Sequence, residues 1–144
     1  MQFDPKNKVI ELCQLGMESE SKMEPNEARR IFEQAWNLAS NDFEKFTAAH
    51  YLARHQPATQ EKLSWDEVAL AHALKVLDFD MAPNFPSLYL NIAKDYEDLG
   101  EWTKAEQNYR LAESFLEDLP EDGYGEMIRS GIKIGIERLA RHSN

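Results

Sequence analysis

The stretch that decides the fold runs from Pro86 to Pro120 and reads PSLYLNIAKDYEDLGEWTKAEQNYRLAESFLEDLP. In its first half, residues three, four and seven positions apart fall on one face of a helix. These residues are Tyr89, Ile92, Ala93 and Tyr96. The second half shows a similar stripe at Ala105, Tyr109 and Ala112. Between the halves, Gly100 can adopt the left-handed conformation that ends a helix. The stretch therefore predicts two amphipathic helices that face each other.

This order and spacing resemble a tetratricopeptide repeat, a helix-turn-helix unit of 34 residues. A second window, from Val9 to Asp42, carries matching residues at the same offsets: Leu12, Leu15, Gly16, Ala28, Phe32 and Ala35. A single repeat cannot bury its own apolar face, so repeats stack into an array with a concave inner surface. The resemblance therefore implies an all-α fold, a right-handed α-solenoid of about three helix pairs.

The segment between the two windows, residues 43–85, is longer than one repeat, and we expect it to be a degenerate repeat. Asp42 is expected to cap its first helix. The sequence Ser64-Trp65-Asp66-Glu67 reads as a capping box that begins its second helix. Residues 55–63 would then form a lengthened loop between the two helices.

After Pro120, a last helix is expected at about residues 126–141, and it would cover the end of the array as a capping helix. Its apolar residues lie on one face and its charged residues on the other. The complete prediction is one domain over residues 1–144, with seven helices. Its repeats span residues 9–42, 43–85 and 86–119.

The charge of the chain narrows the kinds of partner. A net charge of −10 argues against sequence-independent binding to nucleic acid, which needs a surface rich in lysine and arginine. Charges interleaved through the last helix exclude a membrane span there.

Cys13 is the single cysteine, and the N-terminal sequence lacks the build of a secretory signal. We therefore expect a cytoplasmic protein.

Motifs that would indicate an enzyme are missing from the sequence, including the phosphate-binding loop and the Gly-x-Ser-x-Gly nucleophile motif. His50 and His55 are five positions apart, so on a helix they point away from each other and do not form a metal-binding pair. We expect no catalytic residues, no metal and no cofactor.

In the tetratricopeptide family the first helix of each pair lines the concave side, so the resemblance also implies which residues would meet a partner. These candidate site residues are Met17, Tyr51, Arg54, His55, Leu90, Asn91 and Lys94. Arg54 and Lys94 would hold an anionic group, such as a carboxylate of the partner, and the apolar residues would hold its neighbouring side chains. In the alternative interpretation, Arg54 and Lys94 pair with local carboxylates such as Glu97 and Asp98.

The sequence therefore favours a non-catalytic adaptor or scaffold that binds a protein or peptide segment in its concave groove. Two alternatives remain open. One is a structural protein that forms a homo-oligomer through its C-terminal helix or outer face. The other is a small-ligand protein or enzyme that uses the segment from His50 to His55.

Overall fold

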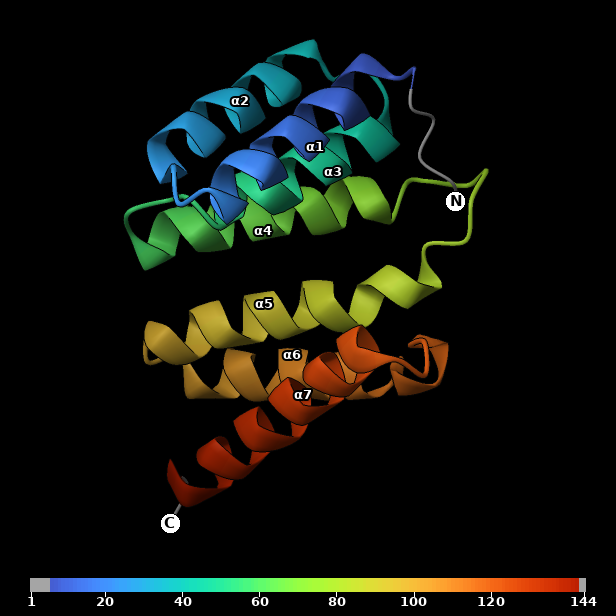
Figure 1. Cartoon of the computed structure of the whole chain (residues 1–144). Coiled ribbons are helices and arrows are strands. Elements are labelled where there is room, and N and C mark those ends of the chain that lie inside the picture. The colour runs from blue at the N-terminus through green and yellow to red at the C-terminus, as the bar shows by residue number, and fades with distance from the viewer. Residues whose placement is uncertain (1–5, 143–144) are drawn as a thin grey trace. The chain divides into compact units, whose positions relative to one another are not determined.

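The computed structural model describes residues 6–142, and within them the fold is built from helices without strands (Figure 1). Seven α-helices follow one another: α1 (Lys8–Ser21), α2 (Pro25–Leu38), α3 (Asp42–Ala53), α4 (Thr59–Ala73), α5 (Phe85–Asp98), α6 (Trp102–Glu113) and α7 (Gly123–His142). Two short 3-10 helices, Ala82–Asn84 and Leu116–Asp118, lie between them. The predicted all-α class and the count of seven α-helices are confirmed for these residues.

The chain divides into two compact units, Met1–Phe79 with α1 to α4 and Asp80–Asn144 with α5 to α7. Each unit is described by itself. The prediction of one right-handed solenoid and of a single domain through residues 1–144 stays a prediction.

In the first unit, α1 pairs with α2 and α3 pairs with α4, while α3 also packs against both helices of the first pair. The ring of Phe32 is fully buried at the centre of this unit. Gly16 makes room for it, because a Cβ atom at this position would lie 2.4 Å from the ring. Gly16 and Phe32, which the sequence assigns to one predicted repeat, are therefore in direct contact.

In the second unit, α5 and α6 form a pair and α7 packs across both of them. The turn between α5 and α6 contains Gly100 with a φ of 76°, as the sequence predicts. The core of this unit contains residues of all three helices: Ala93, Ala105, Tyr109, Ala112, Ile132 and Leu139. The expected apolar stripe of the last helix is therefore the face that packs on the pair before it.

The expected long loop within the central helix pair is wrong. Helix α4 begins at Thr59, so the connection from α3 covers only residues 54–58. Ser64 does not cap a helix; its hydroxyl donates to the carbonyl oxygen of Gln60 inside α4 at 3.1 Å. Burial of Leu63 explains why the first turns of α4 form here. The additional residues of this repeat lie after α4, in residues 74–81, where Phe79 packs edge-on against Phe43 at 6.0 Å.

Two helix starts also differ from the expectation. Asn41, not Asp42, caps α3, and its side-chain oxygen accepts a hydrogen bond from the backbone N–H of Glu44 at 2.8 Å. Helix α7 begins at Gly123 rather than near residue 126, because the Asp122 carboxylate accepts from the backbone N–H of Gly125 at 2.9 Å.

Within residues 6–142, every helix is too short or too polar to traverse a bilayer.

Candidate functional site

The candidate site residues of the sequence analysis fall into both units. Met17 on α1, Tyr51 on α3 and Arg54 and His55 directly after α3 belong to the first unit; Leu90, Asn91 and Lys94 on α5 belong to the second.

The first half is organised by Glu20, which reaches from α1 to the end of α3. One oxygen of the Glu20 carboxylate accepts a hydrogen bond from Nη2 of Arg54 at 2.7 Å. The other oxygen lies 2.6 Å from Nε2 of His55. The guanidinium of Arg54 also lies over the ring of Tyr51, 4.7 Å from its centroid. Charge pairing and a cation–π contact thus fix the position of Arg54.

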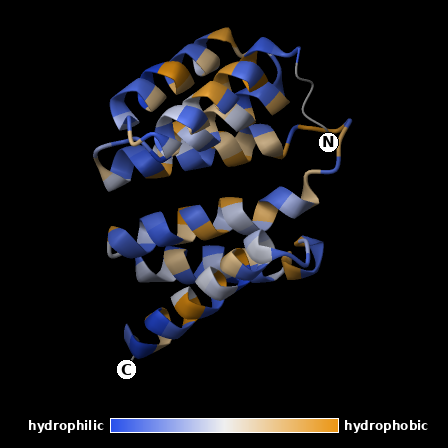
Figure 2. Cartoon of the chain, in the orientation of Figure 1, coloured by the Kyte–Doolittle hydropathy of each residue, from blue (hydrophilic) through white to orange (hydrophobic). Residues whose placement is uncertain are grey.

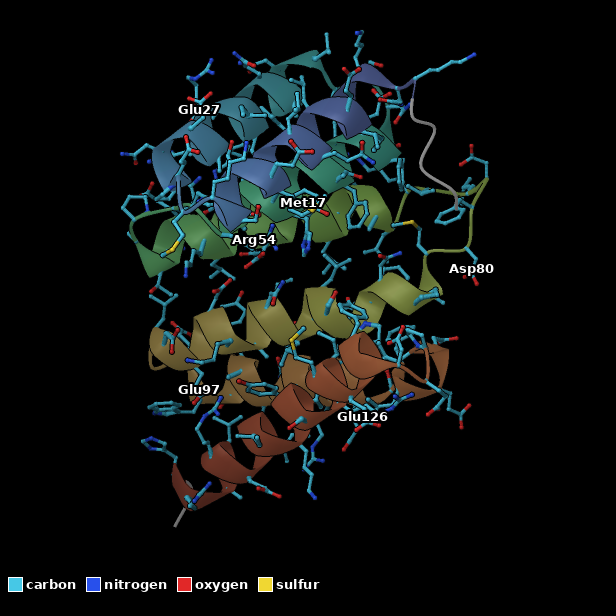
Figure 3. The ribbon with its side chains drawn as sticks, viewed as in Figure 1. Met17, Glu27, Arg54, Asp80, Glu97 and Glu126 are labelled. Atoms are coloured by element: carbon cyan, nitrogen blue, oxygen red, sulfur yellow. The ribbon has the colours of Figure 1, made fainter. Side chains whose placement is uncertain are left out.

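Much of Arg54 remains available to a partner. Its side chain is 46% exposed, and in the described part of the chain only Nη2 has a carboxylate partner. Met17 is exposed on α1, one helical turn before Glu20, and Figure 3 labels both Met17 and Arg54. Tyr51 is stacked on the buried ring of Phe32 at 5.1 Å, which makes it a rigid support. A guanidinium with open N–H groups can bind a carboxylate, and an exposed methionine in the same unit can contact an apolar side chain.

The second half is less suited to an anion. Lys94 pairs with Asp98 one turn further along α5, as the alternative interpretation expected. Asn91 is partly buried. Leu90 packs against both core clusters of the unit, and a Cβ atom at Gly131 would lie 3.1 Å from its Cδ2 atom. Leu90 therefore brings α5 close to α7.

An apolar stripe on α7 was not predicted from the sequence. We call it the α7 stripe, and it consists of Tyr124, Met127, Gly131 and Ile134. The three large side chains are 46%, 61% and 45% exposed, respectively. In Figure 2, apolar segments recur along α7 between polar ones. The spacing of three, four and three positions was visible in the sequence, but it was overlooked because the buried stripe already accounted for one apolar face.

The two histidines of the segment from His50 to His55 lie in different surroundings. His50 lies against Phe46 and Tyr51, and its buried Nδ1 atom has no hydrogen-bond partner within residues 6–142. Burial, with a smaller contribution from the charge of Arg54, lowers the pKa of His50 to about 4, so the ring is neutral at pH 7. His55 instead contacts Glu20 and the ring of Phe32.

Cys13 is buried in the core of the first unit. Burial raises the pKa of its thiol to about 12, so it stays protonated at neutral pH and lacks the thiolate that a nucleophile needs. Among the described residues, His, Cys, Asp and Glu side chains do not gather in groups of three that could hold a metal ion.

No family model, curated protein or solved structure matches this chain.

Proposed function

We propose that this protein is a non-catalytic adaptor of tetratricopeptide type that works in the cytoplasm and binds a segment of a partner protein on its inner helices. The inner helices of this proposal are α1 and α3 in the first unit and α5 and α7 in the second. Its all-α fold class, its three helix pairs and the packing of α7 across the pair of α5 and α6 support this assignment.

The observation that carries the proposal is the α7 stripe beside α5. Large apolar side chains at regular spacing on an exposed helix face are typical of protein interaction surfaces. Leu90 extends this surface onto α5, because Gly131 leaves space for it between the two helices. The stripe therefore offers a partner helix or extended segment a continuous apolar contact within one unit.

The surface residues Met17, Tyr51 and Arg54 of the first unit, which we call the Arg54 surface, suggest the chemistry of the segment that binds there. Its open N–H groups favour a carboxylate, and exposed Met17 favours an apolar residue next to it. We therefore propose a partner segment with an acidic group beside an apolar side chain. The role of Lys94 in this recognition is secondary, since Asp98 already neutralises it.

Self-association is the second candidate function, and the α7 stripe favours it as well. The same face on two copies would bury Met127 and Ile134 against each other, which is the usual arrangement of a symmetric dimer. Sedimentation of the purified protein at micromolar concentration distinguishes a dimer from a monomer.

The test is the double variant Met127→Glu with Ile134→Glu, which adds two negative charges to the stripe. Its matched control is Ser130→Glu with Lys133→Gln, which changes the net charge equally at two exposed positions of α7 outside the stripe. Affinity capture followed by mass spectrometry should recover partners with the wild type and the control but not with the stripe variant. If all three proteins capture the same set and sediment alike, the stripe is not an interaction surface.

A further inference from the structure

A pocket of about 260 Å³ opens in the first unit between α2, α3 and α4, away from the surfaces discussed above. We call it the two-tryptophan pocket; its lining residues are Arg29, Glu33, Trp36, Asn37, Leu52, Gln56 and Trp65. Pockets for drug-sized ligands are usually larger, at roughly 300–1,000 Å³. This pocket therefore suits a single side chain or a small molecule of similar size.

Two indole rings form the aromatic part of the pocket. The centroids of Trp36 and Trp65 are 5.0 Å apart and their planes meet at 85°, so the rings make a corner. His72 contacts Trp36 at 6.2 Å, and the Nδ1 atom of His72 lies 2.8 Å from a carboxylate oxygen of Asp42. These contacts hold the corner in place before a ligand arrives.

The pocket also has polar groups whose hydrogen-bonding capacity is unused. One oxygen of Glu33 accepts a hydrogen bond from Nε of Arg29 at 3.1 Å, and the other has no partner within residues 6–142. The side chain of Glu33 is 51% exposed. The exposed amide of Asn37 also lines the pocket. An incoming ligand thus meets a carboxylate oxygen and an amide next to the aromatic corner.

We propose that the two-tryptophan pocket binds an alkylammonium cation, such as the side chain of a lysine on a partner protein. A cation is attracted to an indole face within about 6 Å of its centroid, and tryptophan is the best ring for this interaction. Both rings line the pocket, where they pack edge to face, so an ammonium group that enters the pocket meets indole surface. A flat guanidinium would stack on only one ring of a perpendicular pair.

Charge supports the same assignment. The free oxygen of Glu33 can pair with the ammonium group, and the net charge of −10 raises the local concentration of cations around the protein. Arg29 opposes binding, because it repels a second cation and engages Glu33. The direction of the change in affinity therefore tests the proposal. Removal of the Arg29 charge strengthens the binding of a cation, whereas it would weaken the binding of an anion.

The pocket is independent of the proposed adaptor function, since its residues belong to α2, α3, α4 and the connection between α3 and α4, and include none of the α7 stripe or the Arg54 surface. The experiment titrates n-butylammonium into the full chain with Trp102→Phe, so that Trp36 and Trp65 are the remaining fluorophores. We expect a saturable fluorescence change with the amine and none with n-butanol, its neutral counterpart.

Two exposed substitutions then decide the proposal without disturbing the core. Glu33→Gln should weaken n-butylammonium binding about fivefold, and Arg29→Gln should strengthen it by a similar factor, because each changes an exposed ion pair worth about 1 kcal/mol. Trp65→Leu should abolish binding. Equal responses to butanol and the amine, an unchanged affinity in Glu33→Gln, or weaker binding in Arg29→Gln would each overturn the proposal.

A second arm identifies the source of the cation. Nα-acetyl-lysine amide and a short lysine-containing peptide are compared with n-butylammonium and tetramethylammonium. Tighter binding of the lysine compounds supports a protein lysine as ligand, whereas tighter binding of the free amines supports a small-molecule amine in the same site.

Discussion

The two units bury an aromatic ring at the same offset of the predicted repeats, but they pack it differently. Phe32 follows Val9 by 23 residues, as Tyr109 follows Pro86, and both rings are fully buried. Phe32 lies against Gly16 of its own helix pair and stacks on Tyr51 of α3. Tyr109 lies against Gly135 of α7, where a Cβ atom would be 2.3 Å from the ring. The glycine that makes room for the ring is thus on the first helix of the pair in one unit and on the third helix in the other.

A carboxylate at a shared offset joins the first and third helices in both units. Glu20 follows Val9 by eleven residues and pairs with Arg54, while Glu97 follows Pro86 by eleven and pairs with Arg138. The first pair is half exposed and uses one N–H group. The second is bidentate, with Nε and Nη2 of Arg138 at 2.7 and 2.9 Å from the two oxygens of Glu97.

The hydroxyl of Tyr109 completes the second junction. It donates to Glu97 at 2.6 Å and accepts from Nη2 of Arg138 at 3.2 Å. Hydrogen bonds from Arg138 hold the pKa of Glu97 below its usual value, while burial and the neighbouring carboxylate raise the pKa of Tyr109. The comparison indicates that ring stacking is the main contact in the first unit, whereas a partly buried polar network joins the helices of the second.

The largest expected effect comes from removing the two rings. Phe32→Ala and Tyr109→Ala should each lower the free energy of unfolding by about 3–5 kcal/mol, because each leaves a cavity at the centre of its unit. Urea unfolding followed by tryptophan fluorescence measures both: Trp102→Phe leaves reporters in the first unit, and Trp36→Phe with Trp65→Phe leaves one in the second. A loss below about 1 kcal/mol for either ring would show that it is not the centre of its unit.

Gly135→Ala should have the next largest effect. Its Cβ atom would overlap the enclosed ring of Tyr109, so we expect a loss of about 1–3 kcal/mol in the free energy of unfolding. Gly131→Ala is the matched control on the same helix, because there the nearest atom is the flexible Cδ2 of Leu90 at 3.1 Å. The control should be neutral or gain up to about 1 kcal/mol of helix stability.

A double-mutant cycle sharpens this prediction. In the Tyr109→Ala background, Gly135→Ala should cost far less than in the wild type, since the ring that it meets is gone. Equal costs in the two backgrounds would place the strain elsewhere in α7.

Periodicity within single helices made much of the fold predictable. Spacing alone reveals features that depend on neighbours within one helix pair. These are the stripes around Tyr89 and Ala105, the turn at Gly100 and the contact of Gly16 with Phe32. The start of α4 was missed because Ser64 resembles a helix cap in sequence, while burial of Leu63 decides the outcome in three dimensions.

Junctions between helix pairs were harder to predict. Arg54 and Glu20 are 34 residues apart and Arg138 and Glu97 are 41 apart, so local patterns carry no signal for these contacts. The sequence analysis placed Arg54 and Lys94 in one patch and gave Glu97 only as a local partner. The α7 stripe could have been found, had each helix been examined for a second apolar face.

The smallest expected effect concerns the two carboxylate junctions. Arg138→Met should lower the free energy of unfolding by about 1–2 kcal/mol at pH 7, because it leaves the largely buried Glu97 without its strongest partner. Arg54→Met should cost less than about 1 kcal/mol, since the pair with Glu20 is half exposed. Urea unfolding of both variants at pH 7 measures the difference.

The dependence of stability on acidic pH should also differ between the two junctions. The folded-state pKa of Glu97 lies below its unfolded value, which is about 4.3, so its contribution to stability is complete above that pH and is lost as the pH falls through the folded value. The wild type should therefore lose stability below about pH 4 more steeply than Arg138→Met, in which the pKa of Glu97 returns toward normal. Arg54→Met should keep the steep acid dependence, because the network of Glu97, Tyr109 and Arg138 is intact in it. If Arg138→Met and the wild type share one acid profile, the second junction contributes no more than the first, and the contrast between the two units is one of geometry without an energetic counterpart.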